Sequence, residues 1–151
     1  MINRQNPMKT WYGAVIIGYK INPLRILIIE NPERKKLTFI SGAVEGDETV
    51  RDAAVRELQE EVHWDIQNTD LEDTGIFHTF TYALDKPGRG GDQGSNSIFL
   101  LNADKLPEPM ETTEAINFHW LSVADALASI SFPDLRDVAA VALRTLSQHY
   151  D

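Results

Sequence analysis

The stretch GAVEGDETVRDAAVRELQEEVHW, residues 42–64, places three glutamates within five positions of one another. They are Glu57, Glu60 and Glu61. Residues 50–62 contain no Gly or Pro and are rich in Ala, Glu, Arg and Leu, so they predict a helix. The sequence therefore crowds like charges along one helix, and this arrangement needs a physical explanation.

Both the start and the apolar side of this helix can be read from the sequence. Thr49, followed three residues later by Asp52, is a candidate N-cap. At about 100° per residue, Val55, Leu58 and Val62 fall on a side that we expect to face the core. The glutamates fan across a different side, so the acidic arc is expected to lie on an anchored helix.

Two explanations of the acidic arc remain open at this point. Like charges three or four positions apart repel by a few tenths of a kcal/mol per pair, and near a helix C-terminus they also oppose the helix dipole. The arc could be a solvated charged face, as most Glu-rich helix surfaces are. Alternatively, its hard oxygen ligands converge on Mg²⁺ or Mn²⁺, which removes the repulsion. Spacing alone does not separate these explanations.

The remaining segments predict a mixed α/β arrangement in one domain, residues 1–151. Short β-branched and aromatic runs bounded by turn residues indicate strands. Strands are expected at residues 13–19, 25–30, 37–41, 75–84, 97–103 and 117–123, and further helices at residues 123–129 and 132–150. The segment 85–96 contains four glycines and is expected to be a mobile loop.

Charge restricts the partners that suit this chain. The net charge is −9, from 14 Lys and Arg against 23 Asp and Glu, which disfavours binding to a nucleic-acid polymer or an anionic membrane. A small polyanion is compatible with this charge if divalent cations bridge it to carboxylates. The sequence does not decide whether the chain is a monomer or a homodimer.

Other features concern the cellular compartment. The chain has no cysteine, so disulfides and thiol chemistry are excluded. The polar start MINRQNPMKT lacks the apolar core of a secretory signal peptide, and no apolar run approaches the roughly 20 residues that span a bilayer. We therefore expect a cytoplasmic protein.

The wider stretch resembles the Nudix box, usually written G-x5-E-x7-R-E-U-x-E-E-x-G-U with U aliphatic. Seven of its nine defined positions match. The matched residues are Gly42, Glu48, Arg56, Glu57, Leu58, Glu60 and Glu61. The resemblance implies an α/β/α sandwich with a mixed β-sheet, and Mg²⁺- or Mn²⁺-dependent hydrolysis of a nucleoside diphosphate linked to another group.

The resemblance also implies roles for the matched residues. Glu60 and Glu61 are similar to the family's metal ligands, and Glu57 to a residue that binds metal or activates water. The backbone carbonyl of Gly42 is implied as a further ligand. Glu48 and Arg56 resemble the pair that fastens the loop to the helix and orients Glu57, although Arg56 could equally form a simple surface salt bridge.

A further carboxylate in such proteins often comes from a distant loop. In some members it precedes a tryptophan that begins the final strand. Glu114, with five residues between it and Trp120, is our candidate for the additional base or ligand, with Glu111 as the alternative. An ordinary loop glutamate remains an equal explanation.

Two positions depart from the box. Its second glycine is His63 here and its last aliphatic residue is Trp64. His tolerates the left-handed conformation that follows a helix, so we expect the helix to end there and His63 to be structural. Trp64 is expected to pack under the loop that follows it rather than touch substrate. Upstream, Ile40-Ser41-Gly42 replaces the common Pro-Gly-Gly, so the path of the loop over the phosphates is less defined.

Three residues are candidates for contacting substrate: Phe80, Tyr82 and Arg89. An aromatic ring at Phe80 or Tyr82 could stack on a base, although their alternation on one strand face favours packing in the core. Arg89 and Lys86 could close over a polyphosphate, or could belong to a hairpin tip without function. Residues 34–36, Arg-Lys-Lys, form another basic cluster, for which a solvated turn is the favoured interpretation.

The signatures that mark NADH-type and ADP-ribose-type members were not found, so substrates such as a nucleoside triphosphate or a dinucleoside polyphosphate are favoured. Two rival functions exist for this pattern. An isoprenoid diphosphate isomerase of this fold relies on a catalytic cysteine, which the chain lacks. A catalytically silent nucleotide-binding or regulatory domain would be expected to have lost box glutamates, and all four are present.

Overall fold

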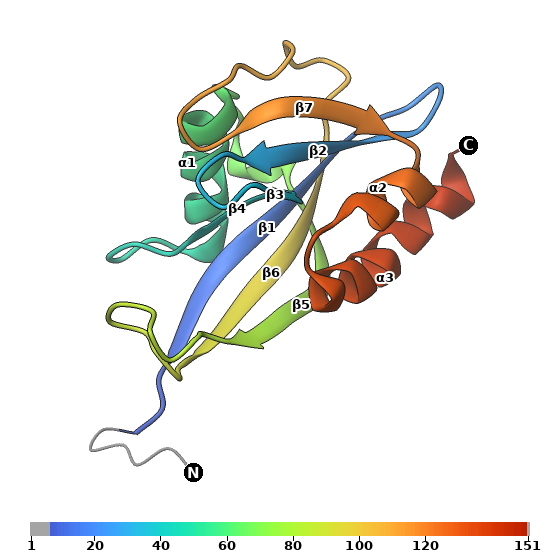
Figure 1. Cartoon of the computed structure of the whole chain (residues 1–151). Helices are drawn as coiled ribbons and strands as arrows, with labels where there is room; N and C mark the ends of the chain where they lie inside the picture. The colour runs from blue at the N-terminus through green and yellow to red at the C-terminus, as the bar shows by residue number, and fades with distance from the viewer. Residues whose placement is uncertain (1–6, 151) are drawn as a thin grey trace.

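The structure is a computed structural model that describes residues 7–150. Seven strands, three α-helices and one short 3₁₀ helix follow one another along these residues (Figure 1). They are β1 (Thr10–Lys20), β2 (Arg25–Asn31), β3 (Lys36–Thr38), β4 (Ile40–Ala43), α1 (Val50–Val62), η1 (Asn68–Asp70), β5 (Glu72–Thr81), β6 (Gln93–Asn102), β7 (Ile116–Leu121), α2 (Val123–Ser129) and α3 (Pro133–His149). None of the helices in the described part is long and apolar enough to cross a membrane.

Strand β1 is the centre of a mixed sheet. It pairs in parallel with β6 from Thr10 to Tyr19, and β6 pairs antiparallel with β5. Its other edge is divided between two antiparallel partners: β4 opposite Gly13 to Ile16, and β2 near Lys20. Strands β3 and β7 both pair with β2. This topology confirms the predicted α/β class and its mixed sheet.

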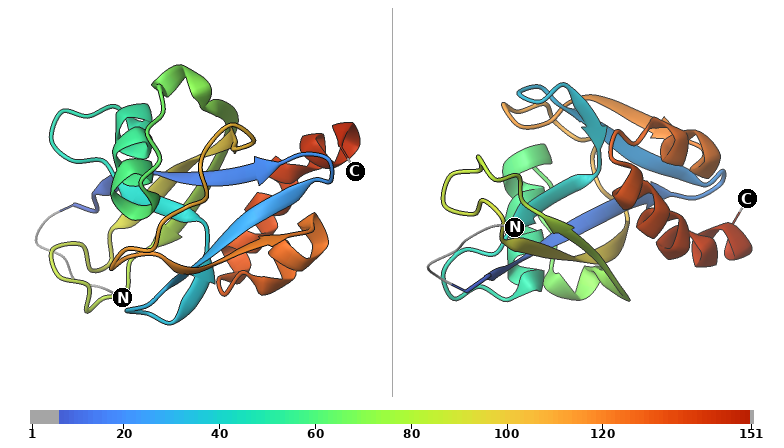
Figure 2. Two further views of the ribbon diagram at one scale, coloured as in Figure 1. Left: turned by 90° about the horizontal axis from the view of Figure 1, so that it is seen from above. Right: turned by 60° about the horizontal axis from the view of Figure 1, so that its bottom comes forward.

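Helices cover both faces of the sheet, as in an α/β/α sandwich. Helix α1 lies on one side, and α2 and α3 lie on the other (Figures 1 and 2). Along β1 the buried side chains alternate between two cores: Val15 and Ile17 pack toward α3, whereas Ala14 and Ile16 pack toward α1. This alternation follows from the two-residue period of a strand, and it confirms the predicted sandwich.

Both ends of α1 agree with the sequence. The Thr49 hydroxyl accepts from the Asp52 N–H and the Asp52 carboxylate accepts from the Thr49 N–H, a reciprocal capping box. His63 ends the helix in the left-handed conformation, with φ 60° and ψ 35°. Trp64 is fully buried, as predicted, but its Nε1 donates to the Pro107 carbonyl in the distant loop between β6 and β7 and not to the loop that follows it.

The single strand expected at residues 37–41 is wrong in detail. The chain forms β3, which pairs with β2, and then β4, which pairs with β1. Phe39 lies between the two strands and is buried in the core beneath α3. One continuous strand could not pair with both β2 and β1 here, so the chain changes its pairing strand at Phe39.

The expected strand at residues 75–84 and loop at residues 85–96 also need correction. Strand β5 ends at Thr81 and β6 begins at Gln93, because residues 93–96 pair with β1 and β5 together. The connection is closed by backbone bonds from Tyr82 N to Asp92 O at 2.8 Å and from Gly91 N to Tyr82 O at 3.1 Å. The buried Asp92 accepts from Trp11 Nε1 at 2.9 Å. The glycines thus form a tight hairpin tip that is fastened to β1, not a loose loop.

Candidate active site

Side chains of α1 bind the edge of β4. Among residues 7–150, β4 pairs with β1 alone. The Ser41 N–H donates to the Glu61 carboxylate, and Arg56 Nη2 donates to the Ala43 carbonyl at 2.9 Å. Backbone groups at a strand edge need partners when they are covered. The helix supplies them, and this brings its acidic side against the strand.

Arg56 links the loop before α1 to the helix. Its guanidinium donates to both oxygens of Glu48, at 2.8 and 3.0 Å, and to Glu57 Oε1 at 2.8 Å. These bonds and charges raise the pKa of Arg56 and lower that of Glu48. The side chain of Arg56 is only 20% exposed, so the contact is more than a surface salt bridge. It holds Glu57 in one orientation.

Three carboxylates meet beside this linkage. Glu57 and Glu61 from α1 and Glu114 from the loop before β7 each offer an oxygen within 4.8 Å of the others. We call them the carboxylate cluster. Glu57 is 9% exposed and Glu61 is 5% exposed. Among the described residues, the buried Oε2 atom of Glu61 has no hydrogen-bond partner.

Burial strongly affects the protonation of the cluster. It raises the pKa of Glu61 to about 10, with the bond to Glu57 and the charges of Glu57 and Glu114 adding to the rise. Burial also raises the pKa of Glu57, against the lowering effect of its bonds to Glu61 and Arg56. In the metal-free protein, Glu61 therefore keeps a proton at neutral pH and the cluster avoids adjacent buried charges.

The residues of the cluster suit a hard divalent cation. Mg²⁺ and Mn²⁺ prefer carboxylate and carbonyl oxygens. An unpartnered buried oxygen costs free energy, and a cation at this position would satisfy it. The position of Gly42 agrees, because a Cβ added there would overlap the Glu57 carboxylate. Only glycine lets β4 approach Glu57 this closely.

The structure does not bring all the predicted ligands together. Glu60 lies outside the cluster, with its side chain 55% exposed and Oε2 3.2 Å from Arg56 Nη1. Of the two candidates in the distant loop, Glu111 accepts from the Asn117 N–H at 2.9 Å, whereas Glu114 faces the helix. The Glu111 carboxylate therefore bonds within its own loop and does not belong to the cluster.

Thr112 joins that loop to α1. Its hydroxyl donates to the Glu61 carbonyl at 2.8 Å and accepts from the Glu114 N–H at 3.2 Å. The Met110 N–H donates to the Val62 carbonyl at 3.2 Å. These bonds hold the loop against α1 and so position Glu114 in the cluster. Sequence reasoning missed Thr112, and only its place two residues before Glu114 could have suggested it.

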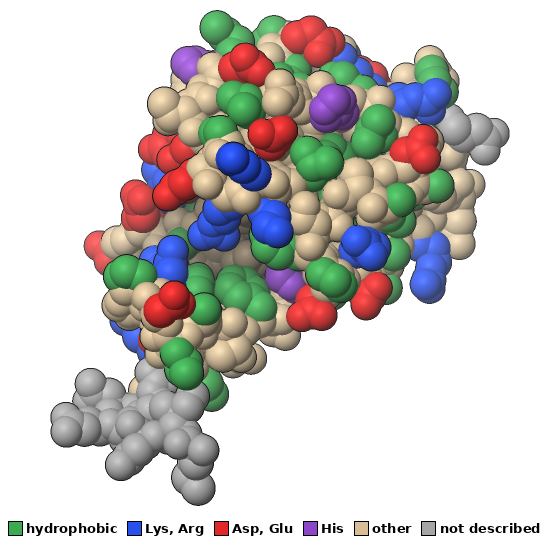
Figure 3. Space-filling view, in the orientation of Figure 1, with side chains coloured by type: hydrophobic (Ala, Val, Ile, Leu, Met, Phe, Trp, Pro, Cys, Tyr) green, Lys and Arg blue, Asp and Glu red, His purple; other side chains and the backbone are tan. Residues whose placement is uncertain are grey.

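A cavity of about 710 Å³ lies on the α3 side of the sheet. Figure 3 shows a hollow on this face, with Lys and Arg side chains around it and hydrophobic side chains within it. Ser41 lines this cavity and also donates its N–H to Glu61. The cavity and the carboxylate cluster therefore lie on the two sides of β4 and meet at Ser41.

Aromatic side chains form one wall of the cavity. His78 and Phe80 on β5 and Tyr82 just after its end line it together. The His78 and Phe80 rings are stacked at 5.2 Å, and the Phe80 and Tyr82 rings meet edge to face at 5.0 Å. Neither Phe80 nor Tyr82 belongs to the buried core, so the preference for core packing was wrong. Both are available to a ligand.

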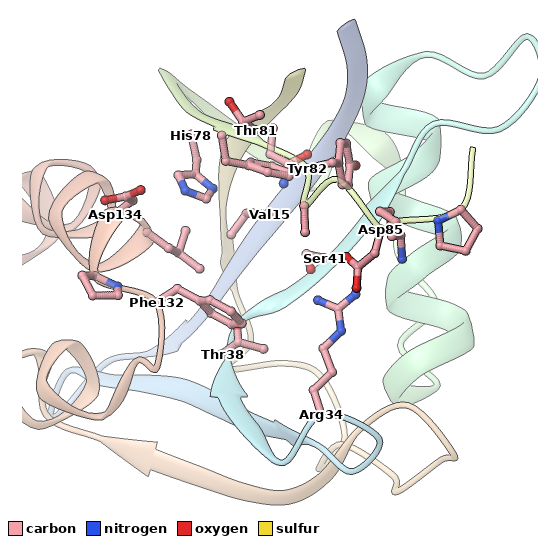
Figure 4. Close-up of a pocket in the computed structure, with 17 residues that line it drawn as sticks. Val15, Arg34, Thr38, Ser41, His78, Thr81, Tyr82, Asp85, Phe132 and Asp134 are labelled. Atoms are coloured by element: carbon pink, nitrogen blue, oxygen red, sulfur yellow. The ribbon is translucent and has the colours of Figure 1, made fainter. Parts of the chain in front are cut away.

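The basic residues divide into two groups. Arg34 and Lys86 line the cavity, and Figure 4 shows the Arg34 guanidinium pointing toward Asp85 at the end near β4. Arg89 lies behind the wall: its Nη1 donates to the Tyr82 hydroxyl at 3.0 Å and its guanidinium stacks on Trp11. Arg89 therefore supports Tyr82 and does not line the cavity.

Comparison with known proteins extends these observations. A family model described as the NUDIX domain matches residues 12–143. No curated protein matches the chain. The structure of the E. coli dihydroneopterin triphosphate pyrophosphohydrolase is similar, with a TM-score of 0.72 and 22% identity over 84% of this chain and 90% of that one.

Two further solved structures share the fold. A C. elegans Ap4A hydrolase has a TM-score of 0.66 and 19% identity over 92% of this chain and 96% of that one. The NUDIX domain of Shewanella oneidensis NrtR, solved with ADP ribose, has a TM-score of 0.67 and 12% identity over 95% and 94%. At these identities the likeness establishes the fold and not the substrate.

Proposed function

The chain belongs to the NUDIX domain family, and on this premise we propose that it hydrolyses a diphosphate bond in a nucleotide-type compound, using Mg²⁺ or Mn²⁺. A nucleoside triphosphate or a dinucleoside polyphosphate is the substrate class that we favour. One observation carries the proposal. Glu61 has a buried, unpartnered oxygen in a cluster of three carboxylates, beside a cavity of ligand size.

Glu57, Glu61 and Glu114 are the residues that would hold the ion. The Gly42 carbonyl, implied as a further ligand, instead lies against Gly13 of β1, where an added Cβ would be 2.6 Å from it. A divalent ion bound there would neutralise the diphosphate oxygens and make water more acidic. Arg56 fixes Glu57 from one side, and Thr112 fixes Glu114 from another. The chain thus positions its carboxylates before the substrate arrives.

Glu57 and Glu114 are the candidates for the group that accepts a proton from the attacking water. Glu57 is oriented by Arg56 and Glu114 is exposed at the mouth of the cluster. Glu60, which the resemblance implies as a metal ligand, lies outside the cluster and is a third candidate for this base. Its bond to Arg56 places it at the exposed edge of the site.

The substrate is proposed to lie across β4. Arg34 and Lys86 would meet the phosphates at the end of the cavity near the cluster, and the aromatic wall would meet the remaining part. The similar proteins are named for dihydroneopterin triphosphate and Ap4A as substrates, and one was solved with ADP ribose. A small molecule of this kind fits a cavity with an aromatic wall and a basic rim.

A nucleotide-binding or regulatory domain without catalysis is the second candidate. The NUDIX domain of NrtR, a similar fold, was solved with ADP ribose. The retained cluster favours hydrolysis, because a domain that only binds a nucleotide has no need for three converging carboxylates.

Hydrolysis in ¹⁸O-water tests the proposal. The protein is incubated with Mg²⁺, or with Mn²⁺, and a panel of nucleoside triphosphates, dinucleoside polyphosphates, nucleotide sugars and dinucleotide cofactors. Mass spectrometry of the products identifies the substrate class and the phosphorus that takes the oxygen. Glu61→Gln is expected to lower the rate at least about 100-fold, whereas Glu72→Gln, an exposed glutamate at the start of β5, should leave it unchanged.

The outcomes separate the two candidates. Labelled product that requires the divalent ion and Glu61 supports hydrolysis. Binding of panel compounds without any labelled product, with both ions tried, would favour the nucleotide-binding domain instead.

A further inference from the structure

The two ends of the cavity differ in chemistry. The end near β4 carries Arg34 and Lys86 with Asp85 beside them, two cations to one carboxylate, and leads to the carboxylate cluster. The opposite end carries Asp134 and His78 beside the start of α3, away from β4 (Figure 4). A bound molecule is therefore expected to present phosphate at one end and a hydrogen-bond donor group at the other.

Phe80 provides a flat surface between these ends. A Cβ added to Gly94, its partner on β6, would overlap the Phe80 ring. The ring therefore lies across the strand over Gly94. Phe132 faces the cavity from the opposite wall (Figure 4). A planar heterocycle can stack on an aromatic ring of this kind, and stacking stabilises it whatever its substituents.

Asp134 and His78 determine which hydrogen-bonding groups a bound heterocycle must present at this end of the cavity. An ionised carboxylate only accepts hydrogen bonds, and its two oxygens accept two parallel N–H groups best. Burial lowers the pKa of His78, against the raising effect of the nearby Asp134 charge, so its imidazole is neutral at pH 7. The negative charge at this end is therefore available to a ligand.

We propose that the cavity selects a heterocycle with two adjacent N–H donors on one edge, a guanine-type or pterin-type ring, with this edge on Asp134 and the ring plane on Phe80. The proposal rests on the proposed function for its phosphate-bearing substrate and specifies which bases that substrate carries. Asp134 is thus a specificity-determining residue.

The preference follows from ring chemistry. Guanine presents N1–H and the 2-amino group side by side, and a 2-amino-4-oxo pterin presents the same pair. Hypoxanthine lacks the 2-amino group, and adenine offers an amino group beside an acceptor nitrogen. Uracil places its N–H between two carbonyl oxygens, which a carboxylate repels. Each lost or repulsive contact lowers the affinity.

Binding of nucleoside monophosphates tests this inference apart from catalysis, because they contain no diphosphate bond. Calorimetry would compare GMP, IMP, AMP and UMP with the wild-type protein and with Asp134→Asn and Phe80→Leu. Asp137→Asn is the matched control, one turn along the same helix and outside the cavity. We expect GMP to bind about 10-fold more tightly than IMP, because the 2-amino group adds one hydrogen bond to a charged group.

The variants should act differently. Asp134→Asn is expected to remove the discrimination between GMP and IMP, while Asp137→Asn keeps it. Phe80→Leu should weaken all four ligands by a similar factor. Equal affinity of the wild type for GMP and IMP, or full discrimination in Asp134→Asn, would overturn the inference. Either result leaves metal-dependent hydrolysis intact, since the ¹⁸O experiment measures that separately.

Discussion

Glu61 is the side chain in which burial and ionisation conflict most strongly. It is 5% exposed, it lies against Glu57, and its Oε2 atom has no partner within residues 7–150. Burial and its neighbours raise its pKa from 4.5 to about 10. Between these values the folded protein holds a proton that the unfolded chain releases. The free energy of unfolding of the metal-free protein therefore falls as pH rises through this window.

The first prediction follows for Glu61→Gln in the metal-free state. Glutamine keeps the shape of the side chain and its bond to Glu57 but carries no charge. At pH 8 in EDTA, we expect its melting temperature to exceed that of the wild type by at least about 3 °C. The difference should shrink toward zero as pH falls to about 4.5. Thermal unfolding followed by circular dichroism measures both.

Adding Mg²⁺ provides the complementary half of this experiment. It should raise the melting temperature of the wild type and leave Glu61→Gln almost unchanged, because only the wild type gains a ligand. A variant less stable than the wild type at pH 8 without metal would show that Glu61 is not protonated and buried as described.

The sequence could not rank the glutamates of the box. Glu57, Glu60 and Glu61 have the same chemistry and adjacent positions, so periodicity places them on one arc. Burial distinguishes them, and it depends on what packs against each one. Glu61 meets the edge of β4, whereas Glu60 points to solvent beside Arg56.

At the scale of elements, the loop between β6 and β7 completes the cluster. It is held to α1 by the Thr112 hydroxyl, the Met110 N–H and the Trp64 indole. Without these bonds Glu114 would lie in an unrestrained segment. The cluster therefore depends on docking this loop as much as on α1 itself.

The second prediction concerns Thr112. Thr112→Val keeps the volume of the side chain but loses the hydroxyl that bonds Glu61 and Glu114. We expect the Kd for Mn²⁺ to rise about 10-fold, as for other residues that orient metal ligands. Thr112→Ser should keep nearly wild-type affinity. Titration of free Mn²⁺ by electron paramagnetic resonance reports this without a substrate.

Thr113→Val is the control, since Thr113 is the exposed neighbour. If Thr112→Val and Thr113→Val weakened Mn²⁺ binding equally, the Thr112 hydroxyl would not be what positions Glu114.

Local signals predicted α1 better than they predicted the strands. The capping box and the left-handed His63 are set by neighbouring residues. The ends of β3, β4 and β6 depend on which strand lies alongside. Residues 93–96 looked like loop because of their Gly, Ser and Asn, and pairing on both sides made them strand.

Across the whole molecule, β4 separates the carboxylate cluster from the cavity. Gly42 is close to Glu57 on one side, and Ser41 reaches both regions. A substrate that fills the cavity and places its phosphates at the cluster must contact both. Metal binding and nucleotide binding are therefore expected to be coupled.

The third prediction measures that coupling. The probe is the α,β-methylene analogue of whichever nucleotide binds best, since its diphosphate cannot be hydrolysed at the bridge. Mg²⁺ should tighten its binding about 10-fold in the wild type and less than about 2-fold in Glu61→Gln, as typical coupling free energies allow. By reciprocity, bound analogue should lower the Kd for Mn²⁺ by the same factor by which bound Mn²⁺ lowers the Kd for the analogue. Calorimetry gives both values.

The nucleoside without phosphate is the control, and its affinity should not respond to Mg²⁺. Equal tightening of the analogue in wild type and Glu61→Gln would place the ion elsewhere and remove the link between the cluster and the cavity.

The sequence by itself determined the family, the α1 helix with both its ends, and the acidic character of the site. These depend on residue types at short, fixed spacings. Only the tertiary structure decided that Glu114 joins Glu57 and Glu61, that Phe80 and Tyr82 line a cavity, and that burial raises the pKa of Glu61. The physical reason is that contacts between distant segments, and the burial that shifts a pKa, arise from packing and leave no periodic trace along the chain.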